Sequence, residues 1–327
     1  MPDPGRDWPL VGRAAELDDL ETLLTDATDA AGGVVVLEGE AGVGRTSLVD
    51  ALRSGARLLG IEDAAGPGST RIGPPPADGR ARLVVLEDLQ DWPDDALEAL
   101  ADAAREGVPA RTLVVLTLRP VPHRDGVVRV VSGWTRAGAQ HVELRTLPAA
   151  AAAELAEAIL GASLGPSLRG AVATAGGNPR FVVDVVTAAR DAGALAPVEG
   201  GIDAVVLGWR AVVEQRVRGR LDYLDDEVLA LLAVASVLGV SFVVVDLAVV
   251  VGQPVPEVWR TLRHALAAGV VQARGDRLVF RHDVVRAALY GGLAPDERRG
   301  LHARAATTLR DAGAPQAVVA THLERAR

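Results

Sequence analysis

The residues with the clearest chemical potential lie near the start of the chain, in the segment Gly39-Glu40-Ala41-Gly42-Val43-Gly44-Arg45-Thr46. The segment follows a short apolar run and precedes a helical pattern, which is where a phosphate-binding Walker A loop occurs. Glycines let backbone N–H groups turn toward a phosphate, and the start of the next helix adds its positive end. The Thr46 hydroxyl would bind Mg²⁺. The alternative is a glycine turn between a strand and a helix that binds nothing.

Position 45 departs from the usual pattern, because arginine stands where a Walker A loop has lysine. A guanidinium keeps the positive charge but is planar and bulkier than an ammonium group. The chain contains no lysine at all, so all 34 basic residues are arginine. The scarcity of Lys, Asn, Ile, Phe and Tyr beside abundant Ala, Gly, Val, Arg and Pro is typical of a GC-rich coding sequence. We therefore interpret the missing lysine as compositional bias.

A second apolar run, residues 83–86, ends in two acids, Glu87 and Asp88. In a nucleotide site the first acid would hold Mg²⁺ through water, and the second would orient the attacking water. Glu87 is one methylene longer than the usual aspartate, so its metal geometry differs. Arg119, at the end of a third apolar run, could reach a γ-phosphate; the alternative is an ordinary surface arginine.

The first half of the chain alternates helical and strand patterns, which indicates a parallel α/β sheet. The expected strands are residues 34–37, 83–86, 113–118 and 142–144, and the expected helices are residues 14–24, 46–52 and 96–105. After Pro148 the pattern is helical only, over residues 149–160, 167–175 and 181–192, and residues 193–201 indicate a linker.

The last third predicts three helices, two short strands around Gly275-Asp276 and a further helix, the order of a winged helix. Residues 301–327 then give two short helical patterns, as at the start of a helical repeat. The helix predicted at residues 255–268 would be the recognition helix of a DNA-binding winged helix. Its arginines, Arg260 and Arg263, are typical of a solvated face, so we do not expect direct DNA binding.

The composition agrees with a folded, non-nucleic-acid-binding protein of two or three domains. The 327 residues are 49% apolar and carry 34 basic and 43 acidic residues, a net charge of −9. Sequence-independent nucleic-acid binding requires basic surface. The absence of cysteine excludes disulfides, thiolate nucleophiles and Cys-based zinc sites. The first residues contain no apolar signal region, so we expect a cytoplasmic protein.

The uncharged run at residues 228–245 is long enough to raise the question of a membrane span. Gly239-Val240-Ser241 interrupts it, and the three acids at residues 225–227 precede it, as in the first turn of a soluble helix. We predict a buried helix, a turn and a second apolar segment, with no membrane contact.

Several segments together resemble a known family. In chain order they are LVGR with Glu16-Leu17, GEAGVGRTSL, LVVLEDLQDW, LTLR, GGNPRF and FRHDVVRAALY. Their order is similar to that in STAND-type P-loop ATPases, and most similar to the N-terminal ATPase module of large LuxR-type (LAL, MalT-like) bacterial transcription regulators. The resemblance covers about residues 8–327. It implies an α/β P-loop NTPase domain at residues 1–147, a helical lid at 148–200, a winged helix at 201–297 and the first repeat helices at 298–327, without the C-terminal DNA-binding domain.

The resemblance also implies roles for individual residues. The adenine and ribose side would be lined by Val11, Gly12 and Arg13. The loop contacts to the nucleotide would come from Gly39, Gly42, Val43, Gly44, Arg45, Thr46 and Ser47. Arg119 resembles the sensor arginine, Pro179 would pack on adenine from the lid, and His282 would touch ADP from the winged helix. The alternatives are that Gly177-Asn178-Pro179 is only a helix-ending turn and that His282 is a core histidine.

The implied function is an ATP/ADP switch with Mg²⁺, in which bound ADP holds the domains together. Protein partners or self-association would use the helical C-terminal end. Arg45 and Glu87 predict weak hydrolysis or none. Residues 46–83 are also fewer than the family usually has, so we expect a sheet that lacks one strand and a mobile loop at residues 66–79. The alternatives are a degenerate ATPase that serves as an interaction scaffold and, least favoured, an active ATPase.

Overall fold

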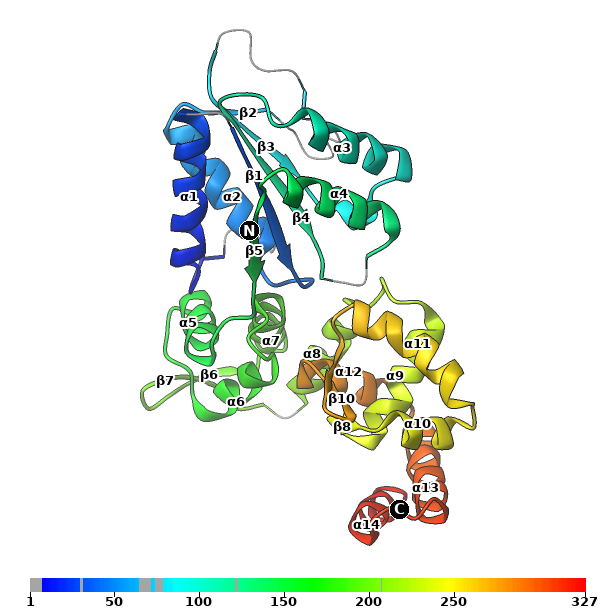
Figure 1. The fold of residues 1–327 in the computed structure, drawn as a ribbon. Coiled ribbons are helices and arrows are strands. Elements are labelled where there is room, and N and C mark those ends of the chain that lie inside the picture. Colours follow the sequence, from blue (N-terminus) through cyan, green and yellow to red (C-terminus); the bar gives the residue numbers. More distant parts are fainter. Residues whose placement is uncertain (1–7, 30–31, 65–71, 74–78, 121–122, 207) are drawn as a thin grey trace. The chain divides into compact units, whose positions relative to one another are not determined.

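Runs of valine and leucine form a parallel sheet in the first part of the chain (Figure 1). The sheet has five strands in the order β2-β3-β4-β1-β5. They are β1 (Gly33–Gly39), β2 (Glu62–Asp63), β3 (Arg82–Leu86), β4 (Thr112–Leu118) and β5 (Gln140–Leu144). Strands β3 and β4 are buried along their whole length, as parallel strands covered on both faces are.

The computed structural model describes residues 8–29, 32–64, 72–73, 79–120, 123–206 and 208–327. The chain divides into two units, Met1–Thr146 (unit 1) and Leu147–Arg327 (unit 2). The loop expected at residues 66–79 lies mostly outside the described residues.

Helices cover both faces of the unit 1 sheet (Figure 1). Alternate residues of each strand point to opposite faces. Leu37 and Val85 pack with α1 (Ala14–Asp29) and α2 (Arg45–Leu58). On the other face, residues such as Val36 and Leu116 pack with α3 (Asp94–Glu106) and α4 (Asp125–Arg136). The result is a three-layer α/β/α arrangement.

The strand order brings the segments that follow β1, β3 and β4 to one edge of the sheet. β4 lies between β1 and β3, with Glu38 opposite Leu118 and Leu86 opposite Leu116. Because all three strands are parallel, their carboxyl ends meet at this edge, where α/β folds bind ligands. The glycine loop, the two acids and Arg119 therefore share one region.

One expectation for unit 1 is wrong, and one helix was not predicted. The segment after α2 does contribute a strand, the two-residue β2, which pairs with β3 at Glu62↔Arg82. α4 is also an unexpected helix, although Val127, Val130 and Trp134 have helical spacing and are fully buried.

Unit 2 begins with three helices, α5 (Ala149–Leu160), α6 (Pro166–Thr174) and α7 (Pro179–Asp191). The linker expected at residues 193–201 is instead most of an antiparallel hairpin of β6 (Leu195–Val198) and β7 (Gly201–Ala204). The hairpin is held to α6 because the Asp203 carboxylate accepts hydrogen bonds from the N–H groups of Ser167 and Leu168, at 3.1 and 2.7 Å. Such an acid satisfies the open N–H groups at a helix start.

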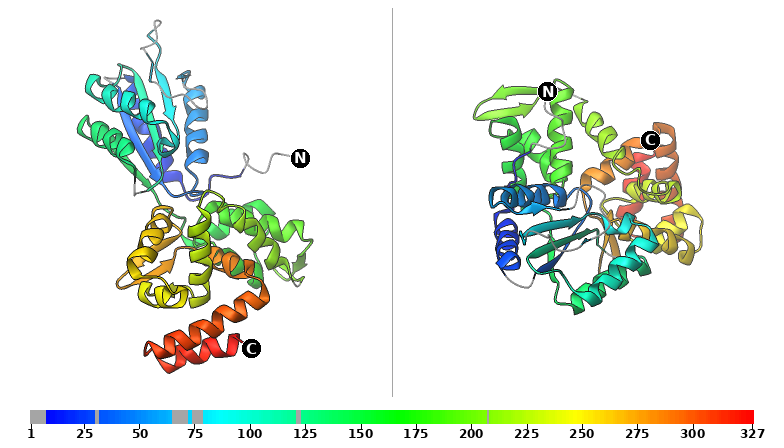
Figure 2. Two further views of the ribbon diagram at one scale, coloured as in Figure 1. Left: turned by 90° about the vertical axis from the view of Figure 1, so that its right-hand side faces the viewer. Right: turned by 90° about the horizontal axis from the view of Figure 1, so that it is seen from above.

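The remainder of unit 2 combines helices with a three-stranded antiparallel sheet in the order β8-β10-β9. The elements are α8 (Trp209–Arg218), α9 (Asp226–Leu238), β8 (Ser241–Phe242), α10 (Val244–Val251), α11 (Val255–Ala267), β9 (Val271–Arg274), β10 (Arg277–Phe280) and α12 (Asp283–Gly292). The expected pair of strands around Gly275-Asp276 is present. The last helices, α13 (Pro295–Asp311) and α14 (Gln316–Arg325), pack side by side (Figure 2).

The apolar run at residues 228–245 is divided between α9, β8 and the start of α10. Among the described residues, no helix combines the length and apolar character needed to cross a bilayer.

Candidate functional site

The glycine loop joins the carboxyl end of β1 to the start of α2. Gly42 and Gly44 have φ of 78° and 105°, left-handed values that favour glycine. Gly44 is the residue before the first turn of α2, and no side chain among the described residues caps that turn. The first N–H groups of the helix are thus open to an anion. Thr46 and Ser47 are exposed on the same turn.

Arg13 reaches the loop from the segment before α1. Its side chain is buried, and Nη2 donates hydrogen bonds to the carbonyl oxygens of Val43, at 3.0 Å, and Arg145, at 2.5 Å. Nη1 donates to Glu16 Oε1 at 2.9 Å. Arg13 therefore binds the backbone of the loop. Its neighbours Val11 and Gly12 are half-buried and exposed, respectively.

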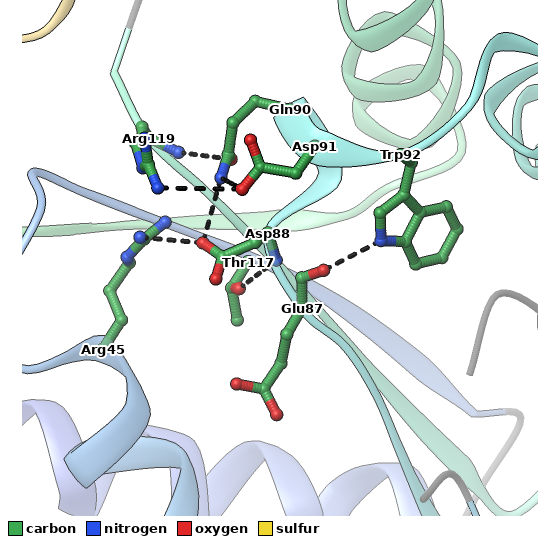
Figure 3. Close-up of polar contacts among 8 residues, drawn as sticks. All are labelled: Arg45, Glu87, Asp88, Gln90, Asp91, Trp92, Thr117 and Arg119. Carbon is green, nitrogen blue, oxygen red and sulfur yellow. Dashed lines mark hydrogen bonds and ion pairs between the residues drawn. The ribbon is translucent and has the colours of Figure 1, made fainter. Parts of the chain in front are cut away.

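Arg45 and Asp88 form an ion pair across the site, with Nη2 and Oδ1 2.9 Å apart (Figure 3). The Arg45 side chain is 11% exposed and that of Asp88 is 44% exposed. Arg45 Nη1 is buried and has no hydrogen-bond partner among the described residues. Burial lowers the pKa of the Arg45 guanidinium, and the charge of Asp88 opposes that effect. A buried cation with an unsatisfied donor favours a further anion.

Glu87 and Asp88 are consecutive, yet their carboxylates point in different directions (Figure 3). Asp88 adopts φ 53° and ψ 52°, a left-handed conformation uncommon outside glycine, and its N–H donates to Thr117 Oγ1 at 2.9 Å. Glu87 instead lies 3.1 Å from Arg53 of α2. Of the two acids, Asp88 is therefore the one that faces Arg45.

Gln90 connects the ends of β3 and β4 (Figure 3). Its Nε2 donates to Asp88 Oδ1 at 3.0 Å and to Asp91 Oδ2 at 3.1 Å, and its Oε1 accepts from the Arg119 N–H at 3.1 Å. Arg119 Nη2 lies 3.7 Å from Asp91 Oδ2. Gln90 and Thr117 were not among the predicted site residues. The sequence signal for them is that Gln90 lies in the LVVLEDLQDW segment and Thr117 in the LTLR segment, both of which carry the resemblance.

Unit 2 brings two of the predicted segments together. The GGNP turn joins α6 to α7, and Asn178 caps α7 by accepting from the Arg180 N–H at 3.0 Å. His282 is 4% exposed, and its ring packs edge-on against Phe181 with centroids 5.2 Å apart. A Cβ on Gly176 would lie 2.6 Å from His282 Nδ1. The turn and His282 are thus neighbours, although far apart in sequence.

The predicted site residues therefore form two sets. The loop, Arg13, the strand-end acids and Arg119 belong to unit 1, whereas Pro179 and His282 belong to unit 2. Pro179 is the first residue of α7 and is half-buried.

Two solved structures have similar folds. A Walker-type ATPase of Pyrococcus abyssi is 15% identical, with a TM-score of 0.58 over 86% of this chain and 96% of that one. The Aeropyrum pernix ORC2 protein, in ADPNP–ADP complexes, is 13% identical, with a TM-score of 0.52 over 88% of this chain and 96% of that one. No family model matches the chain. No curated protein sequence matches it either. The likenesses show an α/β P-loop NTPase fold.

Proposed function

We propose that the chain is a nucleotide-dependent switch of the STAND type, similar to the ATPase modules of LuxR-type regulators, that binds ATP or ADP with Mg²⁺ and hydrolyses ATP slowly or not at all. The observation that carries the proposal is Arg45. Its buried guanidinium lies at the start of α2 with one carboxylate partner and one unsatisfied nitrogen. A phosphate at the uncapped helix start would supply the missing acceptor.

The residues present fit a nucleotide with its metal ion. Phosphate oxygens would accept from the loop N–H groups and from Arg45, and the exposed Thr46 hydroxyl would bind Mg²⁺. Ser47 would hold phosphate from the same turn. Of the two acids we assign the role nearest the metal to Asp88, because Glu87 lies against Arg53. Arg119 would act as the sensor of the γ-phosphate.

Slow hydrolysis follows from the contacts of Asp88. Its Oδ1 accepts hydrogen bonds from both Arg45 and Gln90. Those two donors leave mainly Oδ2 to accept from a water molecule, and the same carboxylate would also serve the metal ion. The same contacts leave binding possible, because Arg45 can exchange the carboxylate for a phosphate.

In this proposal unit 2 supplies the switching parts. Helices α5–α7 serve as the lid, the segment from α9 to α12 as a winged helix, and α13–α14 as the first repeat pair, which binds a protein partner or a second copy. The packing of His282 beside the GGNP turn supports a shared role for Pro179 and His282 in ADP retention. We expect His282→Ala to weaken ADP retention, measured as the ADP dissociation rate. An unchanged rate would contradict the switch.

The decisive experiment identifies the nucleotide that purified protein carries, by denaturing it and separating the released material by chromatography and mass. We expect near-stoichiometric ADP. Protein that is empty is then titrated with ADP, with and without Mg²⁺, by calorimetry. Thr46→Ala is the matched variant, because it removes the exposed hydroxyl and one methyl group but no charge, and it should abolish the Mg²⁺ dependence.

A degenerate ATPase that acts as a scaffold is the second candidate, and the Arg45–Asp88 ion pair favours it, since it occupies the charge that a phosphate needs. This candidate predicts a site that stays empty in excess Mg·ATP, and partner binding that Thr46→Ala leaves unchanged. ADP binding by the wild-type chain would exclude it.

A further inference from the structure

The contact between Arg13 and the loop orients one specific peptide group. Arg13 Nη2 binds the Val43 carbonyl oxygen at 3.0 Å. In a planar trans peptide the C=O of one residue and the N–H of the next point in opposite directions. Holding the Val43 carbonyl toward the buried guanidinium therefore turns the Gly44 N–H away from it, toward the open side of the loop where α2 begins.

Three of the five hydrogen-bond donors of Arg13 are engaged, and its Nε is buried with no hydrogen-bond partner among the described residues. Nη2 has two N–H groups and binds two carbonyl oxygens, those of Val43 and Arg145. Nη1 binds Glu16. The side chain is 5% exposed. A guanidinium in this position has little to offer an adenine ring, which is the role that the family resemblance implies for it.

We propose that Arg13 is a positioning residue for phosphate: it fixes the Val43–Gly44 peptide so that the Gly44 N–H faces the nucleotide phosphates. The inference rests on the proposed nucleotide site and assigns Arg13 to phosphate recognition instead of adenine recognition. Arg13 also connects this peptide to the carbonyl oxygen of Arg145, the residue directly after β5, so the loop is held to the end of that strand.

Inorganic pyrophosphate separates the two roles, because it offers phosphates without a base. Calorimetric titrations with ADP and with pyrophosphate compare the wild-type chain with Arg13→Met, which keeps the apolar stem and removes the donors. We expect Arg13→Met to weaken both ligands by the same factor, about tenfold, the scale of one hydrogen bond to a charged group. Arg13→Lys, which keeps a donor, should recover part of the loss for both.

Arg82→Met is the matched control. Arg82 is also a buried arginine of unit 1 that donates to a backbone carbonyl, Gly73 O at 2.9 Å, but it lies at the amino end of β3, the opposite edge of the sheet. It should leave both affinities unchanged. If Arg13→Met does not fold, judged by circular dichroism, Arg13→Lys carries the test with the same expectation of equal losses.

Two other outcomes would overturn the inference alone, and a third would also refute the proposed function. Loss of ADP binding with unchanged pyrophosphate binding would overturn the inference in favour of an adenine contact. A lower melting temperature with both affinities unchanged would reduce Arg13 to a stabilising residue and overturn it as well. A wild-type chain that binds neither ligand would refute the proposed function and, with it, the role of Arg13.

Discussion

Two parts of the protein are built from different kinds of contact. The loop corner of unit 1 consists of the glycine loop with Arg45, Asp88 and Arg119. The glycine corner of unit 2 consists of the GGNP turn and His282. In the loop corner, charged side chains face one another, as Arg45 and Asp88 do at 2.9 Å. In the glycine corner, backbone meets backbone: the Leu147 N–H donates to Gly177 O at 2.8 Å, and a Cβ on Gly177 would collide with the Leu147 carbonyl oxygen. Side-chain ion pairs can exchange partners, whereas close backbone packing cannot. The first corner is suited to exchanging ligands, and the second holds Pro179 and His282 in a fixed position.

The largest expected effect comes from filling the glycine corner. Gly177 has φ 76°, so Gly177→Ala adds both backbone strain and a collision. We expect the free energy of unfolding of unit 2 to fall by about 3 kcal/mol or more. Gly193→Ala is the control, because Gly193 has φ 61° but open space around its Cβ position. It should cost about 1 kcal/mol. Equal losses in denaturant titrations would show that close packing does not distinguish this corner.

Unit 2 also contains a pair of buried histidines, His302 of α13 and His322 of α14, whose protonation depends on folding. In unit 2, His302 Nδ1 lies 2.9 Å from His322 Nδ1, and His302 Nε2 lies 3.0 Å from the Tyr290 hydroxyl. Burial, then the charges of His322, Arg325 and Arg298, lowers the pKa of His302 to about 4, and burial with Arg325 lowers the pKa of His322. Below about pH 6.5, the ordinary pKa of histidine, the unfolded chain therefore binds protons at these two positions that the folded state does not bind.

The stability of α13 and α14 should therefore be complete above about pH 6.5 and fall as the pH drops toward 4, by roughly 1.4 kcal/mol per pH unit for one histidine. Hydrogen exchange in the two helices between pH 7 and 4.5 measures the loss. His302→Leu with His322→Leu should flatten the profile, and His264→Gln, at an exposed histidine, should not. An unaltered profile in the double variant would assign the dependence to other groups.

The loop corner should respond in binding more than in stability. Asp88→Asn removes the charge that competes with phosphate for Arg45, so ADP should bind about three- to tenfold more tightly, the scale of a partly exposed ion pair. Calorimetry measures the change, and Asp91→Asn, farther from Arg45, is the control. Weaker ADP binding in Asp88→Asn would mean that Asp88 orders Arg45 for the nucleotide instead of competing for it.

The smallest effect is expected at Gln90. Gln90→Met removes three hydrogen bonds, two to Asp88 and Asp91 after β3 and one from the Arg119 N–H that connects the ends of β3 and β4. Because Gln90 is half-buried and water can replace part of these bonds, the free energy of unfolding should fall by about 1 kcal/mol. Gln140→Met, at the exposed start of β5, should be neutral. Indistinguishable melting curves for the two variants would show that Gln90 does not brace the site.

Much of unit 1 could be predicted from sequence because its strands are uninterrupted apolar runs, which a parallel sheet buried on both faces requires. The placement of the glycine loop, Asp88 and Arg119 at one edge follows from those strands. The partners of the acids could not be predicted, because they depend on the left-handed conformation of Asp88 and on the position of Arg53 on α2, which Glu87 contacts.

The errors have local causes. α4 contains Gly126 and Gly133, which lower helix propensity, and its packing against α3 outweighs that preference: a Cβ on Gly133 would lie 3.3 Å from the Ala104 Cβ. The hairpin of β6 and β7 has the small and proline-containing composition of a linker. It is ordered by tertiary contacts, above all those of Asp203 with the start of α6.

Because position 45 is arginine, the loop has no amine that an acylating reagent can modify. Lysine acetylation can neutralise the charge of an ordinary Walker A loop, but a guanidinium is not acetylated under the same conditions, and this chain has no lysine to substitute for it. Nucleotide reagents that acylate active-site amines should likewise leave the loop unlabelled. A proteome-wide survey of nucleotide sites based on such reagents would miss the proposed site.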